Sequence, residues 1–238
     1  MKNHISTFSN LSLKYFVFAF FVGFGLLFFG CKPKDIEPDY VSIPDVNFEK
    51  ELIKLGIDDV QDGKVLRANV LNIASLSIAG TMIKDLTGIE EFVNLKILNC
   101  SNLHLSSLDI SKNTALTILY CSEDGLTSLD VTKNIVLTIL DCRGNRLNNL
   151  DVSKNISLTD LYCNSNNQLT SLDVSKNTAL TSLRCSSNQL TSLDVSKNTV
   201  LTELSCSSNN IQIICVNNLN QVTSGWEKDP IATYKVCP

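Results

Sequence analysis

The chain has 238 residues, of which 44% are hydrophobic and 18% are charged, and its formal net charge at pH 7 is −4. Lys2 and Lys14 are the only charged residues among the first 30, so the rest of the chain carries 18 basic and 24 acidic side chains. This excess of acidic residues gives no indication of the basic surface that nucleic-acid binding requires. Beyond that segment the only histidine is His104, and the sequence lacks the HExxH, GxSxG, P-loop and CxxC signatures, so we expect a protein that is not an enzyme and uses neither a cofactor nor a catalytic metal.

Residues 1–30 have the composition of an export leader. Lys2 and Lys14 precede an apolar run, from Tyr15 to Phe29, that is short for a membrane span, and Gly30-Cys31 follows it. This arrangement resembles a bacterial lipoprotein signal peptide with Phe28-Phe29-Gly30-Cys31 as its lipobox. The resemblance implies cleavage after Gly30, lipidation of Cys31 and an outer-membrane location, at the cell surface or on the periplasmic face. A plain transmembrane anchor is the alternative.

A tether and a helical cap are expected next. Residues 31–44 contain three prolines and mixed charges, which favour an extended tether. The acidic residues within it resemble the surface-export signals of Bacteroidetes lipoproteins. From Val46 to Ile57 apolar residues recur on one helical face, with Asp45 before them as a capping residue. Since the first repeat of an array exposes an apolar edge, we assign residues 45–72 to an N-terminal cap. The stretch from Asp58 to Asp62 is expected to form a turn, with calcium binding left open.

One 21-residue pattern fills most of the remaining chain. Its copies begin at steps of 21, 21, 21, 22 and 21 residues, at Leu95, Leu116, Leu137, Leu158, Leu180 and Leu201. In Leu183-Arg-Cys185 and again in Leu193-Asp-Val195, apolar and polar residues alternate, which is typical of a strand with one buried face. Such a strand cannot bury its face alone. The copies are therefore predicted to stack coil upon coil into a β-rich solenoid.

The repeat resembles the bacterial leucine-rich repeat family. Its signature is met twice in each copy, at Leu180, Leu183, Cys185, Asn188 and Leu190 and then at Leu190, Leu193, Val195 and Asn198. This doubling is similar to the nested 21-residue subclass of Bacteroidetes-like lipoproteins, and the stretch from Ile73 to Asn94 resembles an internalin-type repeat with a helical turn near Gly88. The resemblance implies a right-handed coil of about seven rungs over residues 73–214. Parallel strands are expected on one face, short second strands on the other, and a C-terminal cap over residues 215–238.

Asparagine and cysteine recur as rows along this solenoid. Each Asn is expected to bond the turn backbone, with local bulges where Leu103 and Asp124 depart from one row and near Asn166 and Asn167. The pair Cys215 and Cys237 lies outside the cysteine row and is expected to form a disulfide. The cysteines at the third apolar position are expected to be buried reduced thiols, with disulfides between rungs as the alternative: Cys100, Cys121, Cys142, Cys163, Cys185 and Cys206.

The second half of each copy carries an outward aspartate, followed three residues later by lysine. We expect the lysines to compensate a repulsive carboxylate row on a solvated face, with calcium binding as the alternative. The two rows are Asp109, Asp130, Asp151, Asp173 and Asp194, and Lys112, Lys133, Lys154, Lys176 and Lys197.

The copies differ from one another mainly at the outward positions of the Leu-x-Cys strand, whereas the opposite segment stays Leu-Asp-Val or Leu-Asp-Ile. Variation confined to one face, with the tyrosine and arginine that are enriched in binding hot spots, indicates a surface that binds a protein or a glycan. A structural envelope protein without a ligand and a regulator of an envelope enzyme or transport complex are the alternatives. The predicted binding residues are Ile118, Tyr120, Ile139, Asp141, Arg143, Asp160, Tyr162, Arg184 and Glu203.

Overall fold

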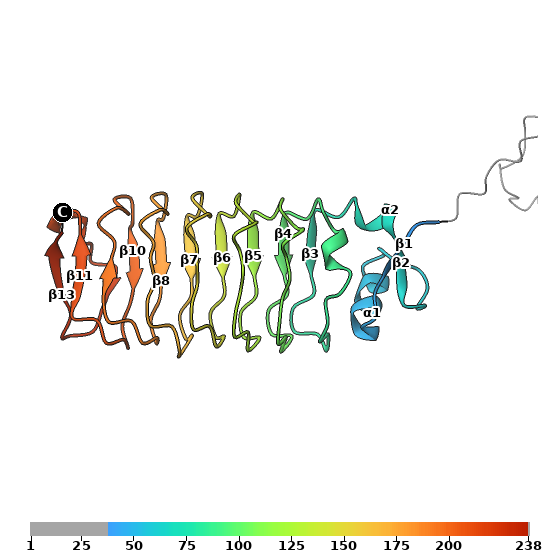
Figure 1. Cartoon of the computed structure of the whole chain (residues 1–238), viewed down its shortest axis with the longest axis horizontal. Helices are drawn as coiled ribbons and strands as arrows, with labels where there is room; N and C mark the ends of the chain where they lie inside the picture. Colours follow the sequence, from blue (N-terminus) through green and yellow to red (C-terminus); the bar gives the residue numbers. More distant parts are fainter. Residues whose placement is uncertain (1–37, 238) are drawn as a thin grey trace, which may run out of the picture. The chain divides into compact units, whose positions relative to one another are not determined.

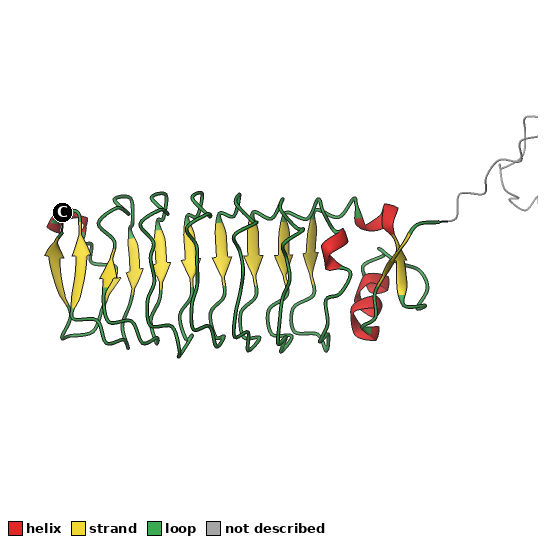
Figure 2. Cartoon of the chain, viewed as in Figure 1, coloured by secondary structure: helices red, strands yellow, loops and turns green. Residues whose placement is uncertain are grey.

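The computed structural model describes residues 38–237, so the expected leader, the lipidation site Cys31 and most of the expected tether lie outside the described residues. The described part is a row of stacked coils with helix confined to its two ends (Figures 1 and 2). Its elements in chain order are β1 (Tyr40–Ser42), α1 (Val46–Lys54), β2 (Lys64–Leu66), α2 (Arg67–Val70), β3 (Ser75–Ser77), η1 (Ile89–Glu91), β4 (Ile97–Asn99), β5 (Ile118–Tyr120), β6 (Ile139–Asp141), β7 (Asp160–Tyr162), β8 (Ser182–Arg184), β9 (Leu193–Asp194), β10 (Glu203–Ser205), β11 (Ile213–Val216), η2 (Leu219–Gln221), β12 (Trp226–Glu227) and β13 (Thr233–Val236).

The first half of each coil contributes one strand to a long parallel sheet. This sheet has eight strands in the order β12-β10-β8-β7-β6-β5-β4-β3, one more than the seven rungs expected. The additional strand arises because Trp226 pairs in register with Leu204 and takes the inward leucine position. The segment assigned to a C-terminal cap therefore contains a further coil.

Stacking places identical apolar positions on top of one another. In the coil that starts at Leu116, the inward residues Leu116, Leu119, Cys121, Leu126, Leu129 and Val131 are all buried. The same positions are buried in the following coils, and together they form one core that runs from Val41 to Ala232. Burial of this continuous apolar column is what holds successive coils together.

The expected second strands form in only part of the solenoid. On the side opposite the long sheet, the described residues contain a three-stranded parallel sheet of β9, β11 and β13, and the equivalent Leu-Asp-Val segments of earlier coils are not strands. In those coils the aspartate side chain accepts a hydrogen bond from the backbone two residues later, as Asp151 does from Ser153 at 2.9 Å. Asp194 makes the same bond with the Ser196 amide at 2.8 Å and lies in the two-residue strand β9, whereas Cys215 stands at this position in β11, which is four residues long.

Two rows of amide side chains hold the turns. In one row each Nδ2 donates to two carbonyls of the preceding coil, as Asn155 does to Val131 and Asn134 at 3.0 and 2.9 Å. Gln221 extends this row, since its Nε2 donates to Val195 and Asn198 at 3.0 and 2.9 Å. In the other row, Asn145 Nδ2 donates to the carbonyls of Cys121 and Cys142 at 2.8 and 2.9 Å.

The residues before the second row adopt a left-handed backbone in every copy. Their φ angles lie between 57° and 66°, although only Gly144 among them is a glycine. Bulges in this row were expected at two places. Near Leu103, His104 is a further left-handed residue, with φ of 59°. In the coil with the extra residue, Asn166 keeps the row position and Asn167 is exposed. The extra residue is thus accommodated outside the ladder.

The N-terminal end of the solenoid is covered by a small unit. β1 pairs antiparallel with β2, and Val41 and Ile43 are buried, so the tether that was expected to reach residue 44 ends earlier. Asp45 caps α1 by accepting from the amides of Asn47 and Phe48, and the helix ends at Lys54, three residues before the expected end. Gly88, with φ of 102°, allows the end of β1 and the residue after it to approach closely, because a Cβ there would lie 2.6 Å from the Ser42 carbonyl oxygen and 2.4 Å from Ile43 Cδ1. Within residues 38–237 no helix has the length and apolarity that a membrane crossing requires.

Candidate binding face

We define the sheet face as the outward surface of the long sheet from β3 to β12. Because side chains alternate along a strand, the residue in the middle of each three-residue strand enters the core and its two neighbours point outward. The parallel register aligns these neighbours in two rows, called here the first and second rows. The first row consists of Ser75, Ile97, Ile118, Ile139, Asp160, Ser182 and Glu203, and the second of Ser77, Asn99, Tyr120, Asp141, Tyr162, Arg184, Ser205 and Glu227.

The character of the sheet face changes along the solenoid. Ile97, Ile118 and Ile139 follow one another in the first row and are all partly exposed, with Tyr120 beside them in the second row. From β7 onward the face becomes charged and hydroxylic. The sheet face therefore has an apolar half near β4 to β6 and a polar half near β7 to β12.

The polar half contains a linked group of side chains. The Tyr162 hydroxyl donates to Asp160 Oδ1 at 3.1 Å, and the Arg184 guanidinium lies over the Tyr162 ring, 5.2 Å from its centroid. Arg184 Nη2 also lies 3.5 Å from Glu203 Oε2, which accepts from the Ser182 hydroxyl at 3.2 Å. These contacts join β7, β8 and β10 and hold the arginine in a fixed position, which reduces the entropy a partner would have to remove on binding.

Two of the outward residues are less accessible than the alternation predicts. Asp141 is only 5% exposed and Ser182 is also buried, although both were expected to face solvent. In the second row Asp141 is aligned between Tyr120 on β5 and Tyr162 on β7, and its Oδ1 accepts from the Arg143 amide at 3.2 Å. Burial raises the pKa of Asp141, while Arg143, whose Nε lies 3.6 Å away, acts in the opposite direction. Asp141 therefore offers little surface to a partner, whereas Tyr120 and Tyr162 on the adjacent strands are partly exposed.

The structure adds residues that the sequence interpretation missed. A hollow of about 410 Å³ lies at the C-terminal end of the sheet face, lined by Arg184, Glu203, Leu204, Ser205, Gly225 and Glu227. Gly225 and Glu227 flank Trp226 and had been placed in the cap. The signal that could have found them is the spacing of 22 residues from Leu204 to Trp226, which continues the repeat. The Ser205 hydroxyl donates to Glu227 Oε2 at 3.1 Å and so fixes one wall of the hollow.

The opposite side is uniform and its aspartates serve the fold. Asp109, Asp130, Asp151 and Asp173 have a lowered pKa, because each side chain accepts hydrogen bonds from the serine or threonine two residues later. In the described part of the chain no lysine of the predicted row comes within ion-pair distance of these carboxylates. The turn backbone, and not the lysine row, is the principal partner of the aspartates.

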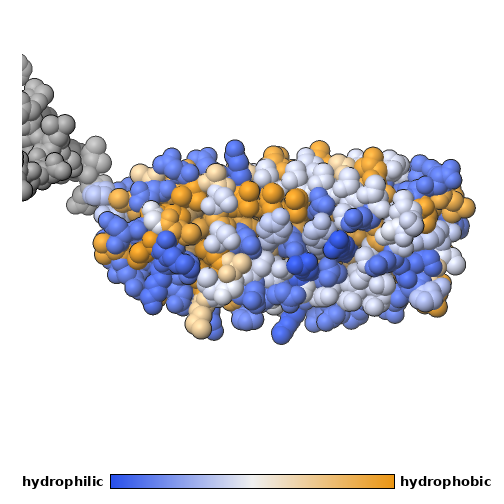
Figure 3. Space-filling view, turned by 180° about the vertical axis from the view of Figure 1, so that it is seen from behind, coloured by the Kyte–Doolittle hydropathy of each residue, from blue (hydrophilic) through white to orange (hydrophobic). Residues whose placement is uncertain are grey.

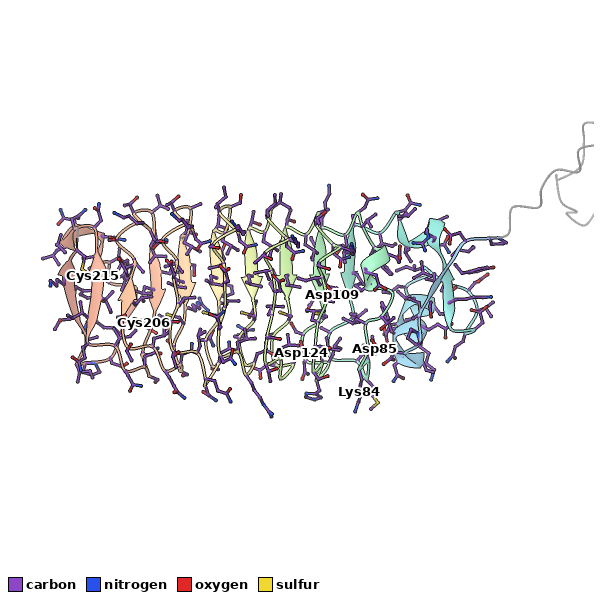
Figure 4. The ribbon with its side chains drawn as sticks, viewed as in Figure 1. Lys84, Asp85, Asp109, Asp124, Cys206 and Cys215 are labelled. Atoms are coloured by element: carbon purple, nitrogen blue, oxygen red, sulfur yellow. A yellow bond between two sulfur atoms is a disulfide. The ribbon has the colours of Figure 1, made fainter. Side chains whose placement is uncertain are left out.

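The two classes of cysteine separate in space. The six cysteines of the row are buried and unpaired, and burial raises the pKa of the Cys163 thiol to about 12, so its reactive thiolate form is suppressed at neutral pH. Cys215 and Cys237 lie next to each other with an S–S distance of 2.06 Å and a Cα–Cα distance of 5.4 Å. Figure 4 labels Cys206, in the buried row, and Cys215, in the outer pair. The disulfide ties β11 to the last strand.

The acidic turn after α1 is organised by a buried glutamate. Glu49 Oε1 accepts from the amides of Asp62 and Gly63 at 2.7 and 2.5 Å, so the loop presents backbone donors inward. Among residues 38–237, no three His, Cys, Asp or Glu side chains converge as a metal site requires. Glu49 thus holds this loop through its backbone.

Comparisons with known proteins relate the chain to leucine-rich repeat structures. No protein-family model matches the sequence, and no curated protein matches it. Among solved structures, it is similar to the functional domain of InlJ from Listeria monocytogenes, described as including a cysteine ladder, with 34% identity and a TM-score of 0.62 over 84% of this chain and 49% of that one. The internalin InlF from Listeria monocytogenes has 20% identity and a TM-score of 0.59 over 75% of this chain and 53% of that one.

A further similar structure is the leucine-rich repeat domain of APL1B, with 20% identity and a TM-score of 0.54, covering 62% of this chain and 47% of that one. The chain spans about half the length of these structures. Together the likenesses show that its fold is the leucine-rich repeat solenoid.

Proposed function

We propose that this leucine-rich repeat chain is an extracytoplasmic binding protein that holds a protein partner on its sheet face. The observation that carries the proposal is the contrast between the two sides of the solenoid. The sheet face changes from coil to coil and presents partly exposed isoleucine, tyrosine and arginine, while the opposite side repeats Leu-Asp-Val with aspartates committed to turns. A spacer without a ligand would have no need of such a contrast.

The composition of the sheet face favours a protein over a glycan. Protein interfaces have apolar centres with tyrosine and arginine, surrounded by a polar rim. Ile118 and Ile139 lie beside Tyr120, and the linked group of Tyr162 and Arg184 follows on the next strands. One side of the molecule is drawn in Figure 3, where apolar surface gathers toward the N-terminal half of the solenoid. A glycan partner and a regulated envelope enzyme or transporter remain the alternative ligands.

Photo-crosslinking on intact cells tests the location of the site. A photoreactive phenylalanine analogue placed at Ile118 should capture a discrete partner, whereas the same analogue at the exposed Ile156, away from the strands, should not. With the captured protein purified as the probe, Tyr120→Ala, Tyr162→Ala and Arg184→Ala should each weaken binding by more than roughly 1 kcal/mol. Lys154→Ala on the opposite side serves as the control. Equal capture from both positions, or equal losses from both sides, contradicts the proposal.

The membrane attachment in this proposal rests on the sequence before residue 38. A lipid on Cys31 would hold the solenoid at the outer membrane, with the residues up to Asp39 as the connection. Cys31→Ala should leave an unprocessed, unlipidated chain, because the thiol is the acceptor of the lipid. The measurement is intact mass together with membrane fractionation. A variant that stays membrane-bound with the processed mass of the parent rules out lipidation at Cys31.

A further inference from the structure

A hollow of about 470 Å³ lies between the turns that follow the Leu-Asp-Val segments of two adjacent coils. Because β11 and β13 run upward in Figure 1 and β9 is parallel to β11, the turn after β9 lies on the upper edge of the molecule. None of the residues that line this hollow belongs to the first or second row of the sheet face. Its lining includes Lys176, Thr178, Ser196, Lys197, Thr199 and Asn217.

The two lysines of the hollow have no carboxylate as a close partner. Within residues 38–237, neither Lys176 nor Lys197 lies within ion-pair distance of an acidic side chain. The aspartates of the same two coils, Asp173 and Asp194, line a separate hollow whose lining contains no lysine. In the next coil Cys215 pairs in register with Asp194, so the aspartate row ends beside Lys197. The lining of the lysine hollow is therefore positively charged and free of acidic groups.

The Ser196 hydroxyl differs from its counterparts in earlier coils. Thr132, at the same position of an earlier coil, donates to Asp130 from both its amide and its hydroxyl, at 2.8 and 2.6 Å. Ser196 donates to Asp194 from its amide at 2.8 Å, while its Oγ is buried and has no partner in the described part of the chain. Ser196 is only 4% exposed and lines the hollow. A buried hydroxyl without a partner costs free energy, and a ligand that accepts a hydrogen bond from it removes that cost.

The donors of this hollow suit a phosphate group. Lysine binds phosphate as a point charge, and a serine hydroxyl can donate to a phosphate oxygen. Thr178 and Thr199 are exposed and place two further hydroxyls at the hollow. A phosphate presents three strong acceptor oxygens, whereas a carboxylate presents two in one plane. The volume of the hollow is in the range of small-molecule sites, so there is also room for the sugar or glycerol group that carries the phosphate.

We propose that the hollow between Lys176 and Lys197 binds the phosphate group of a phosphorylated sugar or of a lipid headgroup. The two ammonium groups neutralise the phosphate from adjacent coils, and the Ser196 hydroxyl donates to one of its oxygens. Both sources present the same phosphate chemistry to these residues. Because the hollow lies outside the sheet face, this site is independent of the proposed protein partner, and each proposal can fail without the other.

NMR of the isotope-labelled full chain in neutral detergent micelles measures binding through the backbone amide signals of Lys197 and Thr199. Glucose 1-phosphate should shift these signals in a saturable manner, whereas glucose, which lacks the phosphate, should not. The double variant Lys176→Gln, Lys197→Gln should weaken binding about tenfold or more, because hydrogen bonds to charged groups are strong. Ser196→Ala should also weaken binding about tenfold. Without the probe, Ser196→Ala should unfold at no lower temperature than the parent chain, because it removes an unpaired buried hydroxyl.

The matched control is the double variant Lys112→Gln, Lys133→Gln, which removes two lysines of the same row. In those coils the Thr132 hydroxyl already donates to Asp130, so this variant should bind glucose 1-phosphate as the parent chain does. Micelles that contain phosphatidylglycerol distinguish the sources. A shift with these micelles alone identifies a lipid headgroup, and a shift with glucose 1-phosphate alone identifies a soluble sugar phosphate. No shift with either probe, the same shift with glucose, or an equal loss of affinity in the control variant overturns the proposal.

Discussion

Asn155→Asp is expected to destabilise the solenoid at neutral pH by roughly 3–5 kcal/mol, the range seen when a buried charge is left uncompensated. Asn155 is fully buried, and its Nδ2 donates to the carbonyls of Val131 and Asn134 at 3.0 and 2.9 Å. Aspartate has nearly the same shape, so no cavity forms, but it places a carboxylate oxygen against those two carbonyl oxygens. The measurement is urea unfolding at neutral pH.

The control is Asn148→Asp, which makes the same chemical change at an exposed position. It should alter stability by no more than about 0.5 kcal/mol. Because coils interact mainly with their neighbours, hydrogen exchange in the Asn155→Asp variant should accelerate first around residues 131–163. As pH falls toward the ordinary carboxyl pKa, the deficit should shrink, since a protonated aspartate can donate to one carbonyl. Equal stability of the two variants at neutral pH contradicts the role assigned to the buried row.

The reverse change, Asp124→Asn, is expected to stabilise the protein by about 1–3 kcal/mol at neutral pH. Asp124, labelled in Figure 4, occupies the position that Asn145 fills in the next coil. Its Oδ1 accepts from the Leu103 amide at 2.8 Å, but its Oδ2 is buried without a partner, where Asn145 places an Nδ2 that donates to Cys121 and Cys142. An asparagine at 124 restores those missing donors.

The pH dependence of this gain has a definite sign. Burial raises the pKa of Asp124 above its ordinary value of 3.8, so the folded state holds the proton more tightly than the unfolded state does. The parent chain is therefore most stable, with respect to this group, below the unfolded pKa, and it loses that stability as pH rises through the folded pKa. The advantage of Asp124→Asn should grow from acid toward neutral pH in thermal unfolding. If the difference in stability between the variant and the parent chain is the same at every pH in this range, the pKa of the Asp124 carboxyl is not raised by burial.

The repeating strands could be predicted from the sequence because their period is exact. Leu183 and Cys185 mark one strand, and the same Leu-x-Cys spacing locates β4, β5, β6, β7, β8 and β10, each with its leucine in the core. The predicted role of asparagine in holding turns is also confirmed, because Asn155 and Asn145 donate from Nδ2 to backbone carbonyls, and Asn145 Oδ1 accepts from the backbone amides of Gly125 and Leu126. These predictions succeed because the same residue type has the same structural role in each of these coils.

The last coil was not predicted because it uses other residue types than the earlier coils at positions that have the same structural role. Trp226 fills a leucine position, Gln221 takes over an asparagine row, and Asp229 accepts from the amides of Ser208 and Asn209 at 2.8 and 2.9 Å as the next member of the other row. At the positions of Trp226 and Gln221 the side chain is longer than its counterpart in the earlier coils. At all three positions the spacing from the preceding coil also differs from 21 residues by one or two. Pattern matching by residue type cannot detect such compensated changes.

The candidate site was only partly predictable for a different reason. Alternation along one strand gives the direction of the Asp141 side chain, but its exposed fraction also depends on residues of other strands, and Asp141 is only 5% exposed. The placement of the Arg184 guanidinium over Tyr162 likewise depends on packing between coils. Direction is a property of one strand, whereas burial and contacts between side chains depend on several coils.

The side-chain hydrogen bonds between coils make the length of this molecule adjustable. Asn155 donates only to the coil before it, and Thr159 does the same when its hydroxyl donates to the Thr138 carbonyl at 3.1 Å. A duplicated segment of 21 residues could therefore be added or lost in the middle of the gene without creating any contact that the chain does not already make. Each such event would lengthen or shorten the sheet face by about 4.8 Å. Recombination within the gene could in this way change the reach of the binding surface while its chemistry stays the same.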